Sequence, residues 1–320
     1  MSAGYTAAPA MKTHSVRADL LMLLAALIWG CSFVAQRLSL ATIGPFFFTG
    51  IRFLLGALVV AGLSHWLKAT DKAFRGDALP AAQRWPWGPG IMLGVVVAIS
   101  ISAQQVGLAY TKVANAGFIS SMYVIIVPIL SLVAGQRLRW GIVAGALCAA
   151  AGLYYLSGEH LTLRFGDGLE LFGAAAISVQ LMVLGSATQR FDPLRLALVQ
   201  NTVCALVCLS VAVFVEPIRL SDIRHSAIAI FYCGALSVGL GYAIQAIAQK
   251  DAVPAHAAII FSMEGVFSAL AAWIIIGETL SPHAIWGCAL VVIGCVLSQV
   301  APLRRRMSGS SQASSPISGR

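Results

Sequence analysis

Charged residues are scarce in this sequence of 320 residues. Asp, Glu, Lys and Arg together make up only 10% of the chain, whereas hydrophobic residues make up 59%. Soluble globular domains carry about 25% charged residues, so this chain has too few of them to cover a surface exposed to water. Apolar stretches of about 20 residues, the length that crosses the hydrocarbon core of a bilayer, recur from one end to the other. The composition therefore predicts a polytopic membrane protein.

Catalytic and nucleotide-binding motifs are absent as well. The sequence has no GxxxxGKS/T phosphate-binding loop, no GxSxG motif and no HExxH motif, which argues against an ATPase domain, a serine hydrolase and a zinc protease. Its seven cysteines all lie in apolar stretches and form no CxxC pair, a pattern typical of packing thiols rather than of disulfides or metal ligands. We therefore expect no enzyme activity, no cofactor and no metal site.

The basic residues indicate how the chain is oriented. A net charge of +9 would suggest a nucleic-acid partner for a soluble protein, but here the 21 lysines and arginines are spread over short connectors. If the N-terminus is cytoplasmic, fifteen of them lie on the cytoplasmic side and five on the outer side, with Arg52 inside a span. Because lysine and arginine accumulate in cytoplasmic loops, both termini are predicted to be cytoplasmic, and no nucleic-acid partner is expected.

Ten apolar segments are predicted to be transmembrane helices, an even number that agrees with two cytoplasmic termini. Several begin at or beside a proline, such as Pro45 and Pro193, which suits the first turn of a helix because the missing N–H needs no partner there. The predicted helices are 18–36, 46–67, 87–109, 114–134, 140–156, 168–187, 194–215, 226–248, 255–276 and 283–301. Residues 1–17 are predicted to be a cytoplasmic N-terminal tail, and residues 302–320 a disordered cytoplasmic tail.

The two halves of the chain, residues 18–157 and 167–301, resemble each other. Since each half has five predicted helices, the second must lie upside down relative to the first, and inverted repeats are typical of secondary transporters. Chance similarity between apolar helices is the alternative. The fold prediction is an all-α integral membrane protein with ten transmembrane helices in two inverted five-helix repeats. The aligned features are Asp19 with Asp167, Gly135-Gln-Arg-Leu138 with Gly277-Glu-Thr-Leu280, and Gly145 and Gly152 with Gly287 and Gly294.

Short motifs in both halves also resemble those of a known family. The sequence is similar to the EamA-like branch of the drug/metabolite transporter superfamily over residues 18–301. The resemblance implies a ten-helix carrier of the inner (plasma) membrane that moves small metabolites, often an exporter of amino acids or related compounds. The family commonly has proline after the glutamate of the ninth helix, where this chain has Gly265, so a helix break is less expected there. The motifs are Ala25-Ala-Leu-Ile-Trp29-Gly30-Cys-Ser-Phe33, Gly50-Ile-Arg52-Phe53-Leu-Leu, Gly107-Leu-Ala-Tyr110-Thr111, Met263-Glu264-Gly265-Val-Phe267 and Gly277-Glu278-Thr-Leu280-Ser-Pro282.

Two ionisable residues are predicted near the middle of spans. Glu264 is the tenth residue of its predicted helix, and a charged side chain at the bilayer centre costs roughly 3 kcal/mol on insertion scales, so it should face a cavity or a partner. It is interpreted as a ligand for a substrate amine or a proton-coupling carboxylate, and a structural hydrogen bond is the alternative. Arg52 is the natural counter-charge, either as a substrate ligand or, alternatively, as a side chain that extends toward the membrane surface.

Polar and aromatic side chains are predicted to complete a binding site with these two residues. In the repeat, Gln104 corresponds to Gln245, and Tyr123 corresponds to Glu264. An amide pair at the midplane suits the binding of a zwitterion through hydrogen bonds, and hydrogen bonding between helices is the alternative. The predicted substrate-binding or coupling residues are Glu264, Arg52, Trp29, Gln104, Tyr123, Gln180, Tyr242 and Gln245.

Three further residues received structural interpretations. Pro128 is expected to interrupt and kink the fourth helix, because proline deprives one carbonyl of its partner. His256 is expected to be exposed at the cytoplasmic start of the ninth helix. Glu278 is expected to mark the outer end of the same helix.

The sequence therefore predicts a secondary transporter of small metabolites that works by alternating access, with export of amino acids or related compounds as the leading hypothesis. Efflux of drugs or other small molecules is one alternative, and a membrane scaffold without transport is another. The expected partners are a small-molecule substrate and the lipid bilayer, without an ATPase subunit. Substrate identity, transport direction, the coupling ion and the choice between monomer and homodimer stay open.

Overall fold

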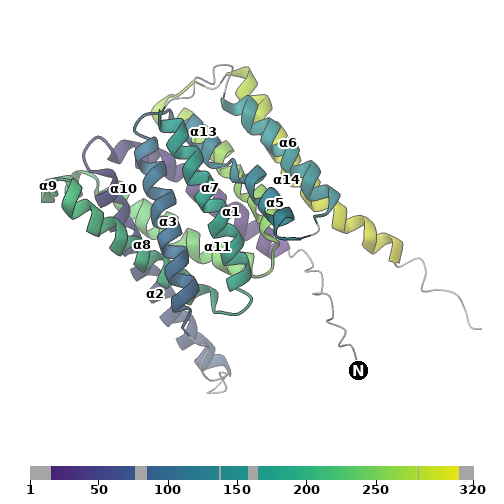
Figure 1. The fold of residues 1–320 in the computed structure, drawn as a ribbon, viewed down its shortest axis with the longest axis horizontal. Coiled ribbons are helices and arrows are strands. Elements are labelled where there is room, and N and C mark those ends of the chain that lie inside the picture. The colour runs from purple at the N-terminus through teal and green to yellow at the C-terminus, as the bar shows by residue number, and fades with distance from the viewer. Residues whose placement is uncertain (1–15, 76–84, 137, 158–164, 280, 310–320) are drawn as a thin grey trace, which may run out of the picture.

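The chain folds into a bundle of helices (Figure 1). A computed structural model describes residues 16–75, 85–136, 138–157, 165–279 and 281–309, and these ranges contain no β-strand. The first half comprises α1 (Val16–Ser39), α2 (Pro45–Arg75), α3 (Trp87–Gly107), α4 (Val113–Ser120), α5 (Tyr123–Val133) and α6 (Trp140–Ser157). The second half comprises α7 (Phe165–Ala187), α8 (Pro193–Val215), α9 (Leu220–His225), α10 (Ala227–Phe231), the π-helix η1 (Tyr232–Gly241), α11 (Tyr242–Gln249), α12 (Pro254–Phe261), α13 (Met263–Ile276) and α14 (Pro282–Gly309).

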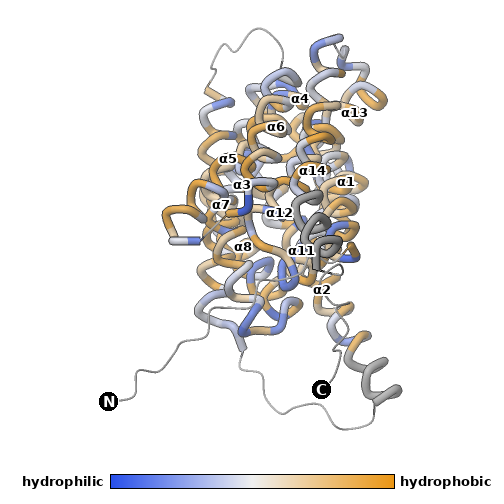
Figure 2. The backbone as a smooth tube through the Cα atoms, turned by 90° about the vertical axis from the view of Figure 1, so that its right-hand side faces the viewer, coloured by the Kyte–Doolittle hydropathy of each residue, from blue (hydrophilic) through white to orange (hydrophobic). Residues whose placement is uncertain are grey.

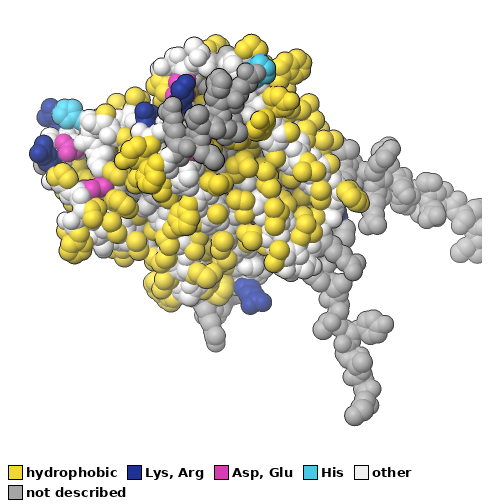
Figure 3. All heavy atoms as spheres, turned by 45° about the horizontal axis from the view of Figure 1, so that its top comes forward, with side chains coloured by type: hydrophobic (Ala, Val, Ile, Leu, Met, Phe, Trp, Pro, Cys, Tyr) yellow, Lys and Arg dark blue, Asp and Glu magenta, His cyan; other side chains and the backbone are white. Residues whose placement is uncertain are grey.

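The outer surface of the bundle is apolar, as the composition predicted. Phe214, Ile228 and Trp140 are each more than 80% exposed, and hydrophobic side chains cover most of the visible face in Figure 3. Hydrophobic residues predominate along most of the length of the helices (Figure 2). Eight continuous or broken helical stretches are long and apolar enough to cross a membrane, and the apolar parts of α6 and α14, Trp140–Tyr155 and Pro282–Ser298, are shorter. The prediction of an all-α membrane protein is confirmed, whereas the count of ten full spans stays a prediction.

The helix starts repeat along the chain with one spacing in the first part of each repeat and a slightly shorter spacing later. Pro45 begins α2 and Pro193 begins α8, a spacing of 193 − 45 = 148 residues. Later in the chain, Val113 begins α4 and Pro254 begins α12, a spacing of 254 − 113 = 141 residues. These two spacings assign an equivalent position in the second repeat to each residue of α1, α2, α4 and α5.

Repeat-related helices α6 and α14 pack side by side at one edge of the bundle (Figure 1). A Cβ atom on Gly145 would lie 2.6 Å from the carbonyl oxygen of Gly294, and one on Gly152 would lie 2.6 Å from that of Gly287. The order of the contacts is reversed between the two helices, so α6 and α14 run antiparallel. The glycines let the backbones approach closely, as in other membrane helix pairs. The glycines aligned in the sequence therefore meet each other across the two repeats.

Two transmembrane stretches are broken at equivalent positions. α4 gives way to α5 at Ser121 and Met122, and α12 gives way to α13 at Ser262; 262 − 121 is again 141. The hydroxyl of Ser121 donates to the Gly117 carbonyl, and that of Ser262 to the Ile259 carbonyl, both at 2.7 Å. Such bonds compete with the regular backbone ladder and bend helices. A break in the ninth helix is thus present without a proline.

Other local expectations need correction. Pro128 does not interrupt its helix but lies inside α5, because the break falls earlier, at Ser121. The predicted helix 226–248 is not one regular α-helix, since its middle is the π-helix η1. Glu278 does follow the end of α13, and its carboxylate also accepts hydrogen bonds of 3.4 Å from the backbone of Val113 and Ala114 at the start of α4.

Candidate functional site

A cavity of about 60 Å³ lies between the two halves of the bundle. Seven of the eight side chains predicted as site residues line it, and Gln180 does not. Its walls come from α1, α2, α3, α5, α7, η1, α11, α12 and α13, so both repeats contribute. The predicted residues that line it are Trp29, Arg52, Gln104, Tyr123, Tyr242, Gln245 and Glu264, together with Ser32, Phe33, Gln36, Phe53 and Phe261 among others.

Glu264 is positioned by the break between α12 and α13. It lies in the first turn of α13 and is only 7% exposed. The Tyr123 hydroxyl donates a hydrogen bond of 2.8 Å to its Oε1 atom, and the Ser121 hydroxyl oxygen would lie 3.1 Å from a Cβ atom on the neighbouring Gly265. Tyr123 and Ser121 both come from the corresponding break in the first repeat. The carboxyl group therefore lies where the two broken helices meet.

Arg52 lies on α2 and does not extend to the membrane surface, since it is only 2% exposed. Its guanidinium carbon lies 5.2 Å from the ring centre of Phe48 and 5.8 Å from that of Phe53, distances typical of cation–π contacts. Among the described residues, no carboxylate lies within 4.0 Å of this guanidinium, so Arg52 and Glu264 line one cavity without forming an ion pair.

Aromatic rings form the apolar wall of the cavity. Trp29 lies 5.4 Å from Tyr242 and 5.2 Å from Phe261, and Phe53 lies 5.6 Å from Tyr242, all between ring centres. The indole N–H of Trp29 donates to the carbonyl oxygen of Ser237 at 3.0 Å, which fixes the ring against η1. Trp29 thus packs between helices and also faces the cavity.

Gln180 lies behind this wall in a buried cluster of amides. Its Nε2 atom donates to Gln200 at 3.0 Å and to Gln245 at 3.3 Å, while Gln245 donates back to Gln180 at 3.2 Å. Gln200 is the repeat equivalent of Arg52, because 52 + 148 = 200. Sequence reasoning missed Gln200, although the proline spacing alone would have paired it with Arg52. Gln104 and Gln245 were expected to present a symmetric pair of amides to the site. Both line the cavity, but their contacts differ because Gln245 takes part in this cluster and Gln104 does not.

The expectation that His256 is exposed is wrong. His256 is fully buried, and its Nε2 atom lies 2.9 Å from Oδ1 of Asp19 in the first turn of α1. This contact joins the first repeat to the second at the end of the bundle where α1 begins. Hydropathy does not distinguish a histidine exposed at a helix start from one that a neighbouring helix covers. Only the packing shows which side of α12 is covered.

A second, larger groove of about 580 Å³ lies between α1, α10, η1 and the end of α13. Its lining is mostly apolar, with side chains such as Val34, Leu38 and Ile228. Neither a carboxylate nor an arginine lines it among the described residues. The smaller cavity is the better candidate site because two buried side chains of opposite charge, Arg52 and Glu264, line it.

Comparisons with known proteins agree with this architecture. The model of the EamA-like transporter family matches residues 16–158 and, a second time, residues 164–299. An uncharacterised transporter from Archaeoglobus fulgidus is 29% identical over 284 residues, which cover 88% of this chain and 85% of that protein. A solved structure, described only as a crystal structure of a protein, is similar with a TM-score of 0.71 over 91% of this chain and 99% of its own, at 22% identity, which shows the fold alone.

Proposed function

Because the chain belongs to the EamA-like transporter family, we propose that this membrane transporter carries small zwitterionic metabolites, amino acids above all, and exports them across the inner membrane by alternating access. No bound nucleotide is needed for such a cycle, since a carrier of this kind uses ion or substrate gradients.

The observation that carries the proposal is the pair of opposite charges in one cavity. Arg52 is buried without a carboxylate partner among the described residues, and Glu264 faces the same space from α13. A buried charge is costly unless it is paired. A zwitterion resolves this, because its carboxylate would bind the guanidinium of Arg52 and its ammonium would bind Glu264.

The aromatic wall and the volume favour one class of zwitterion. Trp29, Phe53, Tyr242 and Phe261 would contact an apolar side chain, and the rings also favour a nearby ammonium group. A cavity of about 60 Å³ has room for several water molecules. This space suits a small amino acid better than a drug-sized cation, which is why drug efflux is the second candidate.

The cavity reaches toward both ends of the bundle. Trp29, Phe33 and Gln36 lie in the second half of α1 and Gln104 near the end of α3, whereas Gln245, the repeat equivalent of Gln104, lies near the end of α11. A central position between two inverted repeats is where a substrate site for alternating access is expected.

Exchange of labelled amino acids across proteoliposomes tests the proposal. We expect exchange with unlabelled amino acid, weak exchange with its methyl ester, which lacks the carboxylate, and weak exchange with its N-acetyl derivative, which lacks the ammonium. Equal exchange of all three compounds would contradict zwitterion recognition. Exchange of a large aromatic cation alone would favour drug efflux, and no exchange of any compound would favour a scaffold.

A further inference from the structure

Glu170 is a second carboxyl group buried within the membrane-spanning part of the bundle. It lies in the second turn of α7 and is 0% exposed. One oxygen, Oε2, accepts a hydrogen bond of 2.7 Å from the Ser120 hydroxyl, and the other, Oε1, has no partner among the described residues. It does not line the cavity of the candidate site. The sequence did not single it out, because an acidic residue near a helix start is also common at a membrane surface.

Close packing of α3 against α7 at two glycines covers one side of this carboxyl group. A Cβ atom on Gly107 would lie 2.8 Å from the carbonyl oxygen of Gly166 and 3.2 Å from Cγ of Glu170. α3 and α7 therefore approach backbone to backbone and cover Glu170 from that side. An ionised carboxylate in such a place, with a single hydrogen bond, would carry a large desolvation penalty, so the arrangement suits a carboxyl group that holds a proton.

Two adjacent serines connect Glu170 with the candidate site. Ser120 donates to Glu170, and Ser121, the next residue, donates to the Gly117 carbonyl. A Cβ atom on Gly265, the residue after Glu264, would lie 3.1 Å from the Ser121 hydroxyl oxygen. Both serines lie at the break between α4 and α5, which thus places one hydroxyl against Glu170 and the next beside the turn that carries Glu264.

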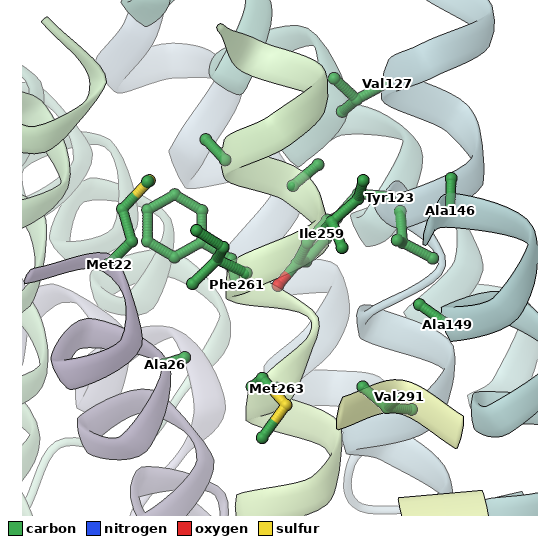
Figure 4. Packing of buried hydrophobic residues seen from close by; sticks show 14 of the residues in the cluster. Met22, Ala26, Tyr123, Val127, Ala146, Ala149, Ile259, Phe261, Met263 and Val291 are labelled. Carbon is green, nitrogen blue, oxygen red and sulfur yellow. The ribbon is translucent and has the colours of Figure 1, made fainter. Parts of the chain in front are cut away.

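Comparison of the two repeats indicates that the fold does not require this carboxyl group. The position equivalent to Glu170 is Met22, because 170 − 148 = 22, and the position equivalent to Ser120 is Phe261, because 120 + 141 = 261. Met22 and Phe261 belong to one buried apolar cluster (Figure 4). The same place in the architecture is therefore filled by apolar packing at one end of the bundle and by a carboxyl–hydroxyl pair at the other.

The titratable groups around Glu170 are few and mostly acidic. On its own helix, Asp167 lies one turn closer to the end of the bundle, and electrostatic interactions link Glu170 to Asp167 and to Glu264 on α13. Of the helices packed against α7, α3 and α4 contain no ionisable residue. Tyr123 on α5 binds Glu264, Tyr242 on α11 lines the cavity, and His256 on α12 binds Asp19. A basic residue, Lys112, immediately precedes α4.

We propose that Glu170 is a proton-binding site that couples transport to the proton gradient. In this cycle, a proton enters from the end where α7 begins, past Asp167, and binds the carboxylate of Glu170. When the contact between α4 and α7 rearranges, the carboxyl group releases this proton through the Ser120 and Ser121 hydroxyls to the carboxylate of Glu264, which then releases a bound substrate ammonium. The proton leaves Glu264 toward the other side, so one proton crosses the membrane against one substrate.

This inference rests on the proposed function, and two assays separate them. The first measures exchange of amino acid between equal concentrations without a pH gradient. The second measures accumulation driven by a pH gradient. For Glu170→Gln we expect exchange close to that of the unaltered protein but accumulation reduced by about tenfold or more, the size of a typical coupling energy. Glu170→Asp, which restores a carboxyl group, should recover part of the accumulation.

A matched control is Ser100→Ala. Ser100 is equally buried and its hydroxyl bonds the Gly173 carbonyl between α3 and α7, so its loss removes a polar contact from the same helix pair without removing a carboxyl group. Its accumulation should stay near that of the unaltered protein. Normal accumulation in Glu170→Gln would overturn the inference. The inference would also be overturned if the unaltered protein exchanged amino acids but did not respond to the pH gradient, although the proposed function would then still stand. If the unaltered protein showed no exchange, the proposed function itself would be overturned.

A measurement on the unaltered protein covers the case in which Glu170→Gln fails to insert. An apolar carbodiimide reacts with protonated carboxyl groups in apolar surroundings, and mass spectrometry locates the adduct. We expect modification of Glu170 but not of Glu278 near the bundle end. Labelling of Glu264 with none at Glu170 would contradict a protonated Glu170.

Discussion

Tyr123 and Glu264 occupy equivalent positions in the two repeats, and the hydroxyl of one donates to the carboxyl group of the other at 2.8 Å across a separation of 141 residues. Residues related by a pseudo-two-fold axis meet only where they lie beside that axis. The hydrogen bond therefore lies at the centre of the inverted repeat, where transporters of this architecture bind their substrates. Both residues follow a serine at which a transmembrane helix is broken.

Replacing Tyr123 with phenylalanine tests this contact. Hydrogen bonds to charged groups contribute about 1.5–3 kcal/mol, so Tyr123→Phe should slow amino-acid exchange by roughly tenfold or more while membrane insertion stays normal. Initial rates in proteoliposomes measure the effect. Tyr155→Phe is the control, because Tyr155 is 46% exposed on α6. An exchange rate in Tyr123→Phe equal to that of the control would remove the hydroxyl from the mechanism.

Arg52→Gln should abolish the preference for a substrate carboxylate. Glutamine keeps a polar side chain but removes the charge, and Gln200 occupies the equivalent position of the second repeat. The unaltered protein should prefer an amino acid over its methyl ester by about tenfold or more, given the strength of charge-assisted hydrogen bonds, and Arg52→Gln should exchange both equally. Arg224→Gln removes an exposed arginine instead and should keep the preference. Retained selectivity in Arg52→Gln would show that the carboxylate binds elsewhere.

The contact between Asp19 and His256 should contribute strongly to stability. Removing one partner of a buried pair typically costs about 3–5 kcal/mol, so Asp19→Asn and His256→Gln should each lower the thermal unfolding midpoint of the protein in detergent. Changing both should cost less than the sum of the single changes, and a double-mutant cycle measures the difference. Additive losses would mean that the two side chains do not stabilise each other.

Glycine substitutions should separate close helix packing from helix propensity. Gly294→Ala places a methyl group 2.6 Å from the Gly145 carbonyl oxygen and should destabilise the protein by about 1–3 kcal/mol, as overpacking does. Gly62→Ala meets no atom within 4 Å and should be neutral or stabilise α2 by up to about 1 kcal/mol, because alanine favours helix. Equal effects of the two changes would contradict the antiparallel contact of α6 and α14.

The orientation can be checked with reporters at the chain ends. The distribution of lysine and arginine predicts that both termini are cytoplasmic, so a fluorescent or phosphatase reporter at either end should give the cytoplasmic signal. A reporter inserted between α8 and α9, near Glu216, should give the outer signal. An outer signal from the C-terminal fusion would contradict an even number of spans.

Much of this architecture could be predicted from the sequence. Hydropathy located the membrane segments because lipid solvates only apolar side chains, and proline marked helix entrances because its missing N–H is harmless there. The aligned glycines identified α6 and α14 as repeat-related. Glu264 stood out because a carboxyl group in an apolar segment is costly to bury unless it has a partner or faces a cavity.

The tertiary structure decided which side chains meet. Gln180, Gln200 and Gln245 form one closed cluster, His256 is buried against Asp19, and Glu170 lies beside Ser120 rather than at a surface. None of these contacts follows from the sequence, because a residue near a helix end has the same local pattern whether water or another helix covers it. Hydropathy reports how deep a segment lies in the membrane, whereas the contacts of a polar side chain depend on how each helix is rotated and where it breaks, and only packing across the two repeats sets those.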